Sequence, residues 1–244
     1  MDKSVYLDLI KIQDTHWWYV GRKKLLMNVL VKYINKENRN RNILDLGCGT
    51  GAMLKVAKQY GNVYGMDYNS SAVAYCNDIL HENVKQGSLP NKVPYKNNMF
   101  DVIMCLDVLE HVKEDVESLE TIFNLLKNNG IAIITVPAFQ FLWGYNDDLV
   151  HHFRRYTKDD LISKSKNVGF SIINYSYFNV FLFPGIYLVR KLKKILNIQK
   201  PDLEETPKDN IINKLLRIIF LFEIKLQKYI RFPFGVSIFI ILKK

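Results

Sequence analysis

Short apolar runs alternate with helical stretches through the middle of the chain. Each run is bounded by polar or glycine-containing turns, which is typical of buried strands. The predicted strands are 43–46, 63–66, 84–86, 101–106, 131–136 and 171–177. The predicted helices between them are 52–59, 71–80, 114–126 and 159–167. This alternation predicts a doubly wound parallel α/β sheet with helices on both faces.

Two local signals support these boundaries. Asn128-Asn129-Gly130 is expected to end a helix, because glycine and asparagine tolerate the left-handed backbone. Thr157, followed by Asp160, is expected to cap the start of the next helix.

Both ends of the chain add helices to this core. Residues 3–36 follow a helical pattern, with an aromatic cluster at 16–19. Residues 180–196 and 211–230 are basic, aromatic and amphipathic, and a polar stretch at 197–210 is expected to be an exposed linker. Residues 236–242 are expected to return to the sheet as a seventh, antiparallel strand.

Composition and charge narrow the class of protein. A chain of 244 residues with 48% apolar residues can bury a substantial core. Thirteen lysines and arginines face five acids from residue 179 onward, so +8 of the net +10 lies in the last quarter. The first 178 residues are nearly neutral, which disfavours polyanion binding there.

Cysteine use and hydropathy suit a protein of the cytoplasm. Cys48, Cys76 and Cys105 are irregularly spaced and form neither a disulfide framework nor a zinc pattern. Acidic residues lie where a signal peptide would be apolar, and no stretch reaches the roughly 18 apolar residues of a spanning helix.

The segment from Asp45 to Gly51 carries the clearest chemical signal, because Gly47, Gly49 and Gly51 follow a predicted strand. Such a loop lets a ligand approach bare backbone. The Asp45 carboxylate would repel a pyrophosphate. It would attract the ammonium and sulfonium groups of S-adenosylmethionine, so the loop predicts this methyl donor. Asp67 ends the next strand, where an acid can accept both ribose hydroxyls; capping the following helix is the structural alternative.

With these motifs the chain resembles the class I S-adenosylmethionine-dependent methyltransferases, in particular the small-molecule group that includes ubiquinone- and menaquinone-biosynthesis enzymes. Phe100–His111 matches the fourth-strand motif and 126–130 precedes strand five. The resemblance implies a seven-stranded Rossmann-like sheet and S-adenosylmethionine as cofactor. The cofactor residues that follow from the motifs are Asp45, Gly47, Cys48, Gly49, Gly51, Asp67, Tyr68, Ser88, Leu89, Leu106 and Asp107.

One position departs from the family. The group often carries Gly-Asp at the end of strand three, where the acid contacts the adenine amine, and this chain has Gly87-Ser88. A hydroxyl can still accept a hydrogen bond. Leu89, Tyr68 and Val108 are expected to enclose the base by packing.

Two further segments are candidates for substrate binding. A subgroup of these enzymes pairs a His-x-Arg-Arg-Tyr run with a His-Trp-Trp segment, and this chain has both. The candidate residues are His16, Trp17, Trp18, His151, Arg154, Arg155 and Tyr156. Two structural alternatives stay open: the arginines pair with Asp147, Asp148 or Asp159, and the tryptophans pack into the core instead of forming a lid.

A hydroxyl acceptor must lose its proton during methyl transfer, and a histidine suits that task near neutral pH. We expect His152 to be the base, with His111 as the second candidate. His111 could instead cap a helix. No metal-ligand spacing stands out, so no metal is expected.

We therefore expect a single domain over 1–244, with an N-terminal helical lid or cap, a cofactor-binding core, a basic helical insertion and a closing strand. The corresponding ranges are 1–40, 41–178, 179–232 and 233–244. The expected activity is methylation of an oxygen or nitrogen on a small or lipid-linked, isoprenoid acceptor. A non-catalytic adenosyl-binding or partner protein and an RNA methyltransferase are the alternatives.

The basic insertion suggests a location. Lysines beside an aromatic apolar face are typical of helices that lie on anionic lipid. We expect a cytoplasmic protein that can associate peripherally with the inner face of the membrane through 179–232. The alternative is that these helices pack on the sheet, and nucleic acid is not the expected partner.

Overall fold

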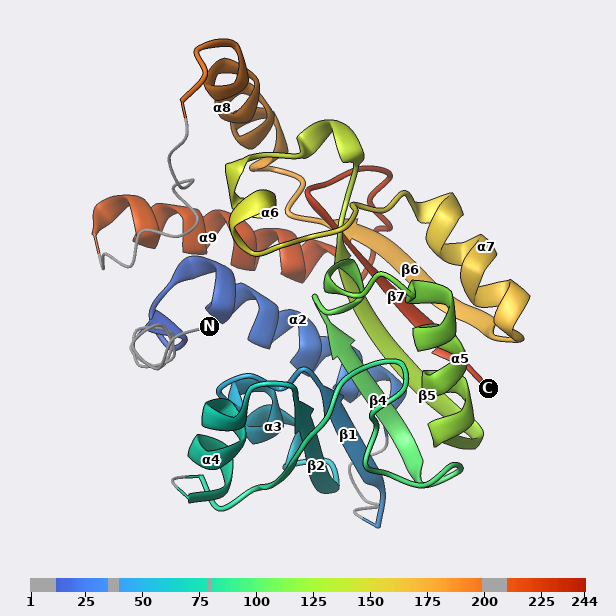
Figure 1. Ribbon diagram of the computed structural model, residues 1–244. Helices are drawn as coiled ribbons and strands as arrows, with labels where there is room; N and C mark the ends of the chain where they lie inside the picture. Colours follow the sequence, from blue (N-terminus) through green and yellow to red (C-terminus); the bar gives the residue numbers. More distant parts are fainter. Residues whose placement is uncertain (1–11, 35–39, 79, 199–209) are drawn as a thin grey trace.

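The computed structural model describes residues 12–34, 40–78, 80–198 and 210–244, and these form one seven-stranded sheet (Figure 1). The strand order is β3-β2-β1-β4-β5-β7-β6. The strands are β1 Asn42–Leu46, β2 Asn62–Asp67, β3 Asn83–Gln86, β4 Phe100–Leu106, β5 Leu126–Pro137, β6 Ser171–Phe178 and β7 Ser237–Lys243. The last strand, β7, is antiparallel to both of its neighbours, so the predicted fold class is confirmed.

Helices accompany this sheet, and most of them pack on its two faces. They are α2 Trp17–Tyr33, α3 Ala52–Ala57, α4 Ser70–Asp78, α5 Asp115–Leu125, α6 Tyr145–Leu149, α7 Lys158–Val168, α8 Phe183–Ile195 and α9 Ile211–Leu226. Two short 3-10 helices, η1 Leu109–His111 and η2 Gln140–Leu142, follow β4 and β5.

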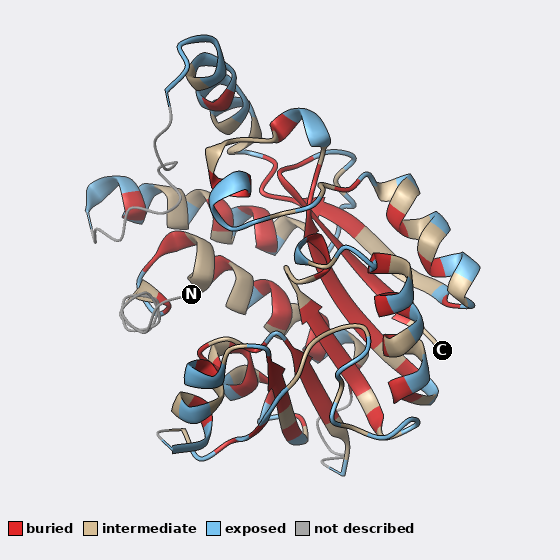
Figure 2. Ribbon diagram, in the orientation of Figure 1, coloured by how far each residue is buried: buried red, intermediate tan, exposed pale blue. Residues whose placement is uncertain are grey.

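The strands separate two hydrophobic clusters because successive side chains point to opposite faces. Ile43 packs with α2, α3 and α9 on one face, whereas its neighbour Leu44 packs with α5 and α7 on the other. The central strands are accordingly buried along most of their length (Figure 2). This burial on both faces explains why these strands read as continuous apolar runs.

The connection between α5 and β5 differs from the prediction. Asn128-Asn129-Gly130 was expected to end the helix, but α5 ends at Leu125 and β5 begins at Leu126. Leu126 is fully buried and pairs with Phe100, and the register then shifts before Val102. Burial of Leu126 against the sheet therefore ends the helix before the glycine, and the asparagines become part of an extended β5.

The cap at Thr157 is confirmed. Its hydroxyl oxygen accepts a hydrogen bond from the Asp160 amide at 3.2 Å, and Gly169 ends α7 in the left-handed conformation. This cap fixes where the chain turns from the ligand-binding edge of the sheet into α7.

The N-terminal aromatic cluster lies in the core. Trp18 stacks on Phe178 of β6 and on Phe220 of α9, and Trp17 is 1% exposed. An ideal Cβ on Gly21 would lie 2.2 Å from the Phe220 ring, so the two helices cross at a residue without a side chain. Of the helix predicted over 3–36, residues 1–11 and 35–39 lie outside the described residues.

The two basic helices behave differently. The α9 helix buries Phe220, Glu223 and Ile224 against α2 and the sheet. The α8 helix stands away from the body, and among its residues only Arg190 is buried (Figures 1 and 2). Most of the linker predicted at 197–210 falls outside the described residues. In the part of the chain that the structure describes, no helix combines the length and apolarity needed to cross a bilayer.

Candidate functional site

The glycine loop joins β1 to α3 at the carboxyl edge of the sheet. Gly47, Gly49 and Gly51 all adopt positive φ, at 71°, 52° and 74°. A Cβ on Gly49 would meet nothing within 4 Å, whereas one on Gly47 would lie 2.5 Å from the Val108 side chain. Gly49 therefore faces open space where a ligand can lie against the backbone, and Gly47 is needed for close packing.

Asp67 lies at the end of β2, directly beside this loop. Its carboxylate accepts hydrogen bonds from the Gly49 and Asn69 amides, each at 2.9 Å. Burial raises the pKa of this side chain, although the amide hydrogen bonds oppose the shift. Each carboxylate oxygen still has a lone pair, so Asp67 can also accept hydroxyl donors from a ribose.

Asp45 lies in β1, just before the glycine loop, and is buried. It is 2% exposed, and burial raises its pKa to about 8, helped by the nearby Asp67 charge and opposed by Arg22. A carboxylate in this position favours a cationic ligand, because a second positive charge would restore its ionised form.

Asp107 ends β4 and is held from two sides. Thr135 donates to one carboxylate oxygen at 3.0 Å, and the Arg22 guanidinium lies 2.6 Å from the other. Asp107 has a φ of 58°, and its amide donates to the Thr135 carbonyl. The N-terminal helix α2 therefore contributes a charged residue to this edge of the sheet.

The remaining predicted cofactor residues surround the loop. The Cys48 side chain is buried, and its amide donates to the Met66 carbonyl, so it shapes the loop. Tyr68 is 61% exposed, and Ser88, Leu89 and Leu106 are partly exposed. This exposure leaves Tyr68, Ser88 and Leu89 accessible to a base, and their role in enclosing adenine stays a prediction.

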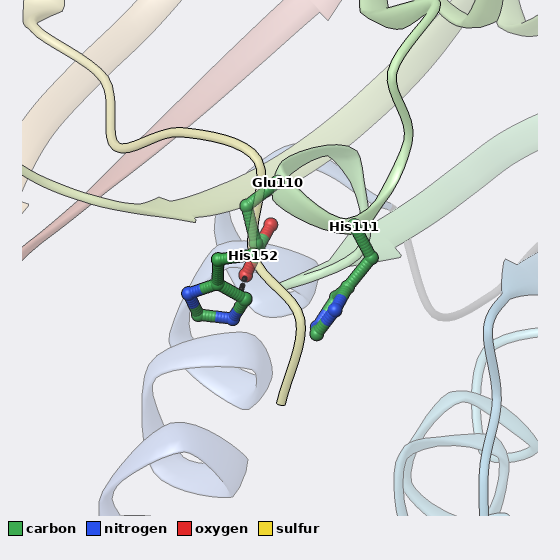
Figure 3. A group of neighbouring side chains, drawn as sticks. All are labelled: Glu110, His111 and His152. Atoms are coloured by element: carbon green, nitrogen blue, oxygen red, sulfur yellow. Dashed lines mark ion pairs between the residues drawn. The ribbon is translucent and has the colours of Figure 1, made fainter. Parts of the chain in front are cut away.

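The two histidines expected to act as bases lie together. His111 ends η1, His152 follows α6, and their ring centroids are 4.5 Å apart (Figure 3). Glu110 lies beside them, with one carboxylate oxygen 3.9 Å from His152 Nε2. The Phe153 amide donates to the Glu110 carbonyl at 2.7 Å, which fixes the two segments against each other.

Asp147 in α6 anchors this cluster. Its carboxylate lies 2.8 Å from His152 Nδ1 and accepts hydrogen bonds from Arg155 Nε and the Gly144 amide. Although burial opposes it, these contacts lower the pKa of Asp147 to about 2. Because an ionised carboxylate only accepts hydrogen bonds, Nδ1 carries the proton and Nε2 keeps a free lone pair.

The arginines of the 151–156 segment make structural contacts. Arg155 pairs with Asp147, as the structural alternative predicted. Arg154 pairs with Asp115 at 2.7 Å, an acid outside the expected set. Tyr156 is 1% exposed, and its hydroxyl donates to the same Asp115. These three residues hold the segment in place, and His151, which is exposed, is the neighbour of His152 that remains accessible.

The His16-Trp17-Trp18 segment packs into the core as the second structural alternative predicted. His16 is 3% exposed, and burial lowers its pKa. The Trp17 amide donates to the Asn213 side chain of the neighbouring helix segment at 2.8 Å. In this structure the segment attaches α2 to α9.

Three residues of the site were missed from the sequence. Arg22 follows the aromatic cluster in a basic run that reads as a solvated face, yet it pairs with Asp107. Glu110 belongs to the fourth-strand motif, and Asp147 was expected to pair with an arginine. Neither was predicted to lie beside His152. Arg22 and Asp107, and Glu110 and His152, are far apart in sequence, so their proximity leaves no local sign; Asp147 lies close in sequence to its partners His152 and Arg155.

The observed edge fits an adenosyl cofactor that carries a cation. Gly49 leaves open space beside its backbone, and Asp67 can accept further hydrogen bonds. The positive charge near Asp45 is too small to keep the pKa of its carboxyl group at the ordinary value. Asp67 would hold the ribose, and the surroundings of Asp45 would favour the ammonium.

Comparison with known proteins agrees with this geometry. A family model described as "Methyltransferase domain" matches residues 44–134, which run from β1 into β5. A protein of Methanocaldococcus jannaschii is 29% identical over 201 residues, covering 73% of this chain and 81% of the relative. Ubiquinone biosynthesis O-methyltransferase of Rickettsia canadensis is 35% identical over 132 residues, covering 48% of this chain and 56% of the relative.

The fold is shared with a solved structure of a methyltransferase. An S-adenosylmethionine-dependent methyltransferase from Archaeoglobus fulgidus superposes with a TM-score of 0.56 at 20% identity, covering 91% of this chain and 94% of that one. The chain spans about half the length of the ubiquinone-biosynthesis enzyme that it matches. The chain therefore contains a methyltransferase domain over residues 44–134 and is similar to the class I S-adenosylmethionine-dependent methyltransferases, whose methyl donor is S-adenosylmethionine.

Proposed function

We propose that this protein methylates an oxygen or nitrogen of a small or lipid-linked acceptor, with an isoprenoid-bearing compound as the favoured class. The observation that carries the proposal is the contact of 2.8 Å between His152 Nδ1 and Asp147. It orients an imidazole whose free Nε2 can accept the acceptor's proton. The name of the Rickettsia canadensis relative, a ubiquinone biosynthesis O-methyltransferase, supports an oxygen acceptor.

The side chains divide the work as follows. S-adenosylmethionine supplies an electrophilic methyl group. Asp67 and the Gly49 backbone hold its adenosyl part, and His152 removes the proton from the acceptor hydroxyl. Asp147 keeps the His152 ring in the productive tautomer, and Arg155 keeps Asp147 ionised. Alignment of acceptor and donor contributes several kcal/mol in such displacements.

Replacement of His152 tests the base assignment. We expect His152→Ala to bind S-adenosylmethionine normally, because among the described residues this ring contacts Asp147, Glu110 and His111 and not the glycine loop, and to lose about 10²-fold to 10⁴-fold in kcat. Calorimetry measures binding and radiolabelled methyl transfer measures turnover. His81→Asn is the matched control, because His81 is exposed, distant in sequence and held at a positive φ that asparagine tolerates. Unchanged turnover in His152→Ala would contradict the role.

The acceptor class requires a separate experiment. Radiolabelled methyl transfer to a cell extract, followed by phase separation, is expected to place the label in the lipid or small-molecule fraction. Label in RNA would instead favour an RNA methyltransferase. Binding of S-adenosylmethionine without any transfer to the extract would favour a non-catalytic cofactor-binding or partner protein.

We further propose that α8 and the exposed face of α9 dock on an anionic membrane surface. On α8, Leu188, Leu192 and Ile195 are exposed beside Lys191 and Lys194. Apolar side chains flanked by lysines suit the boundary between lipid headgroups and acyl chains. Arg190 donates to the Leu142 carbonyl at 2.7 Å, so α8 is tied to the segment that leads to the histidines.

A further inference from the structure

Glu110, His111 and His152 form a compact cluster that the proposed methyl transfer uses only in part. Their side chains come from η1 and from the segment after α6 and converge on one point (Figure 3). One potential ligand atom from each, a carboxylate oxygen or a ring nitrogen, lies within 4.8 Å of the other two.

The Glu110 carboxylate makes no direct ion pair with a lysine or arginine among the described residues, although Arg22 and Arg155 act on it from further away. It is 1% exposed, and its Oε2 atom has no hydrogen-bond partner within the described part of the chain. The nearby acids differ, because Asp107 is paired with Arg22 and Asp147 with Arg155. A buried carboxyl group with an unpartnered oxygen is unfavourable, so a cation at this position would be stabilised by it.

His152 is oriented as metal-bound histidines usually are. Its Nδ1 is held by the ionised Asp147 carboxylate at 2.8 Å, and its free Nε2 lies on the Glu110 side. A carboxylate that fixes the outer nitrogen of an imidazole sets the tautomer and raises the basicity of the inner one. Asp147 would therefore orient His152 as a metal ligand.

We propose that Glu110, His111 and His152 bind a divalent first-row transition-metal ion. Two imidazoles and one carboxylate form a donor set typical of zinc and non-haem iron sites, whereas Mg²⁺ prefers oxygen donors. Bonds of about 2.1 Å place ligand atoms roughly 3–4 Å apart, so the observed cluster needs only small side-chain rotations. His111 is exposed, and its ring contacts the Val150 backbone and the His152 ring, so its rotation would replace these contacts with a bond to the ion.

This site was not predicted, because His111 and His152 are 41 residues apart and their contact exists only in the folded chain. The role of the ion, unlike its binding, rests on the proposed function. Three protein ligands leave coordination positions open, and the ion's charge there would lower the pKa of an acceptor hydroxyl. In the ion-bound protein the Nε2 lone pair of His152 is used for the ion, so the ion would take over the activation of the acceptor hydroxyl, and the methyl donor and acceptor class proposed above stay the same.

Cobalt binding tests the proposal without any assay of activity. Protein freed of its purification tag and stripped by a chelator is titrated with Co²⁺, followed by visible absorption and calorimetry. We expect one ion per chain, with ligand-field bands of an imidazole-containing site. Glu110→Gln and His152→Ala should weaken binding at least about tenfold, and His81→Asn should leave it unchanged.

His111→Ala guards against variants that fail to fold, because its side chain is exposed and its removal should barely affect stability. It should also weaken Co²⁺ binding. Absence of Co²⁺ binding, equal binding in all variants, or preferred binding of Mg²⁺ would overturn the proposal. Calorimetry with S-adenosylmethionine and a methyl-transfer assay on the stripped protein separate the two ideas. Cofactor binding and methyl transfer without any metal would leave the proposed function standing and remove the ion's role in it, whereas the Co²⁺ titration decides whether the metal site exists.

Discussion

Asp45 and Asp147 are both buried carboxylates, yet their surroundings move their pKa values in opposite directions. Burial raises the pKa of Asp45 to about 8, because the Arg22 charge compensates only in part. Burial also acts on Asp147, but hydrogen bonds from His152 and Arg155 lower its pKa to about 2. At pH 7 Asp45 therefore carries a proton, whereas Asp147 is ionised.

The protonated state of Asp45 predicts a linkage between cofactor and proton. Binding of a cationic ligand near Asp45 lowers its pKa, so we expect S-adenosylmethionine to release a proton at pH 7 and to bind more tightly as the pH rises toward about 8. Calorimetry in buffers of different ionisation enthalpy measures the released proton. The same release in Asp45→Asn would assign it to another group.

The same residue predicts how stability depends on pH. The folded-state pKa of Asp45 is raised, so between its ordinary value near 3.8 and about 8 the folded chain binds more protons than the unfolded chain. The Asp45 contribution to the free energy of unfolding is therefore present at low pH and is lost as the pH rises through this window. Urea unfolding between pH 5 and pH 8 should show a smaller decline for Asp45→Asn. An identical decline in both proteins would contradict the shift.

At the scale of elements, the contact between α2 and α9 determines what the N-terminal helix does. Trp17 and Trp18 meet Phe220 with ring centroids 5.5 and 5.7 Å apart, and Gly21 leaves room for the Phe220 ring. Arg22, one residue further, then pairs with Asp107. The α2 helix is thus fixed by the core on one side and reaches the site on the other.

Removing the Phe220 ring should loosen this packing. We expect Phe220→Ala to lower the free energy of unfolding by about 3–5 kcal/mol, because the ring is fully buried and leaves a cavity. Ile218→Ala on the same helix is the matched control. Ile218 is 65% exposed, so its loss should cost about 0.5 kcal/mol or less. Chemical unfolding measures both, and similar losses would show that the aromatic cluster does not stabilise the pair of helices.

At the scale of the whole molecule, charge is separated from the sheet. Net +8 of the +10 lies after residue 178, and α8, whose residues are mostly exposed, stands away from the body (Figure 2). Such a distribution suits a molecule that rests on a surface through one side while its sheet edge faces an acceptor near that surface.

Flotation with lipid vesicles tests this arrangement. We expect binding to vesicles that contain anionic lipid, weakened by salt, and little binding to neutral vesicles. Reversing the charge of exposed Lys191 and Lys194 with glutamate should weaken binding by about tenfold or more. The control reverses exposed Lys96 and Lys166, which lie outside α8 and α9, and should have little effect. Equal losses in both variants, or no binding at all, would count against a membrane-docking face.

The elements of this fold follow from local signals, which is why most could be predicted. Strands buried on both faces leave apolar runs, and the glycine loop with Asp45 and Asp67 is a contiguous pattern. The start of α7 was readable at Thr157 for the same reason. The end of α5 was not, because the burial of Leu126 against Phe100 outweighed the asparagine-glycine signal.

Sequence alone therefore determined the sheet, the glycine loop and the type of cofactor. Which distant residues meet was decided by the folded chain: His152 with Glu110, Arg22 with Asp107, and Tyr156 with Asp115. The physical reason is that periodicity and turn chemistry act over a few residues, whereas hydrogen bonds and ion pairs join side chains that the sheet brings together from distant segments. The chemistry of the histidine cluster belongs to that second category.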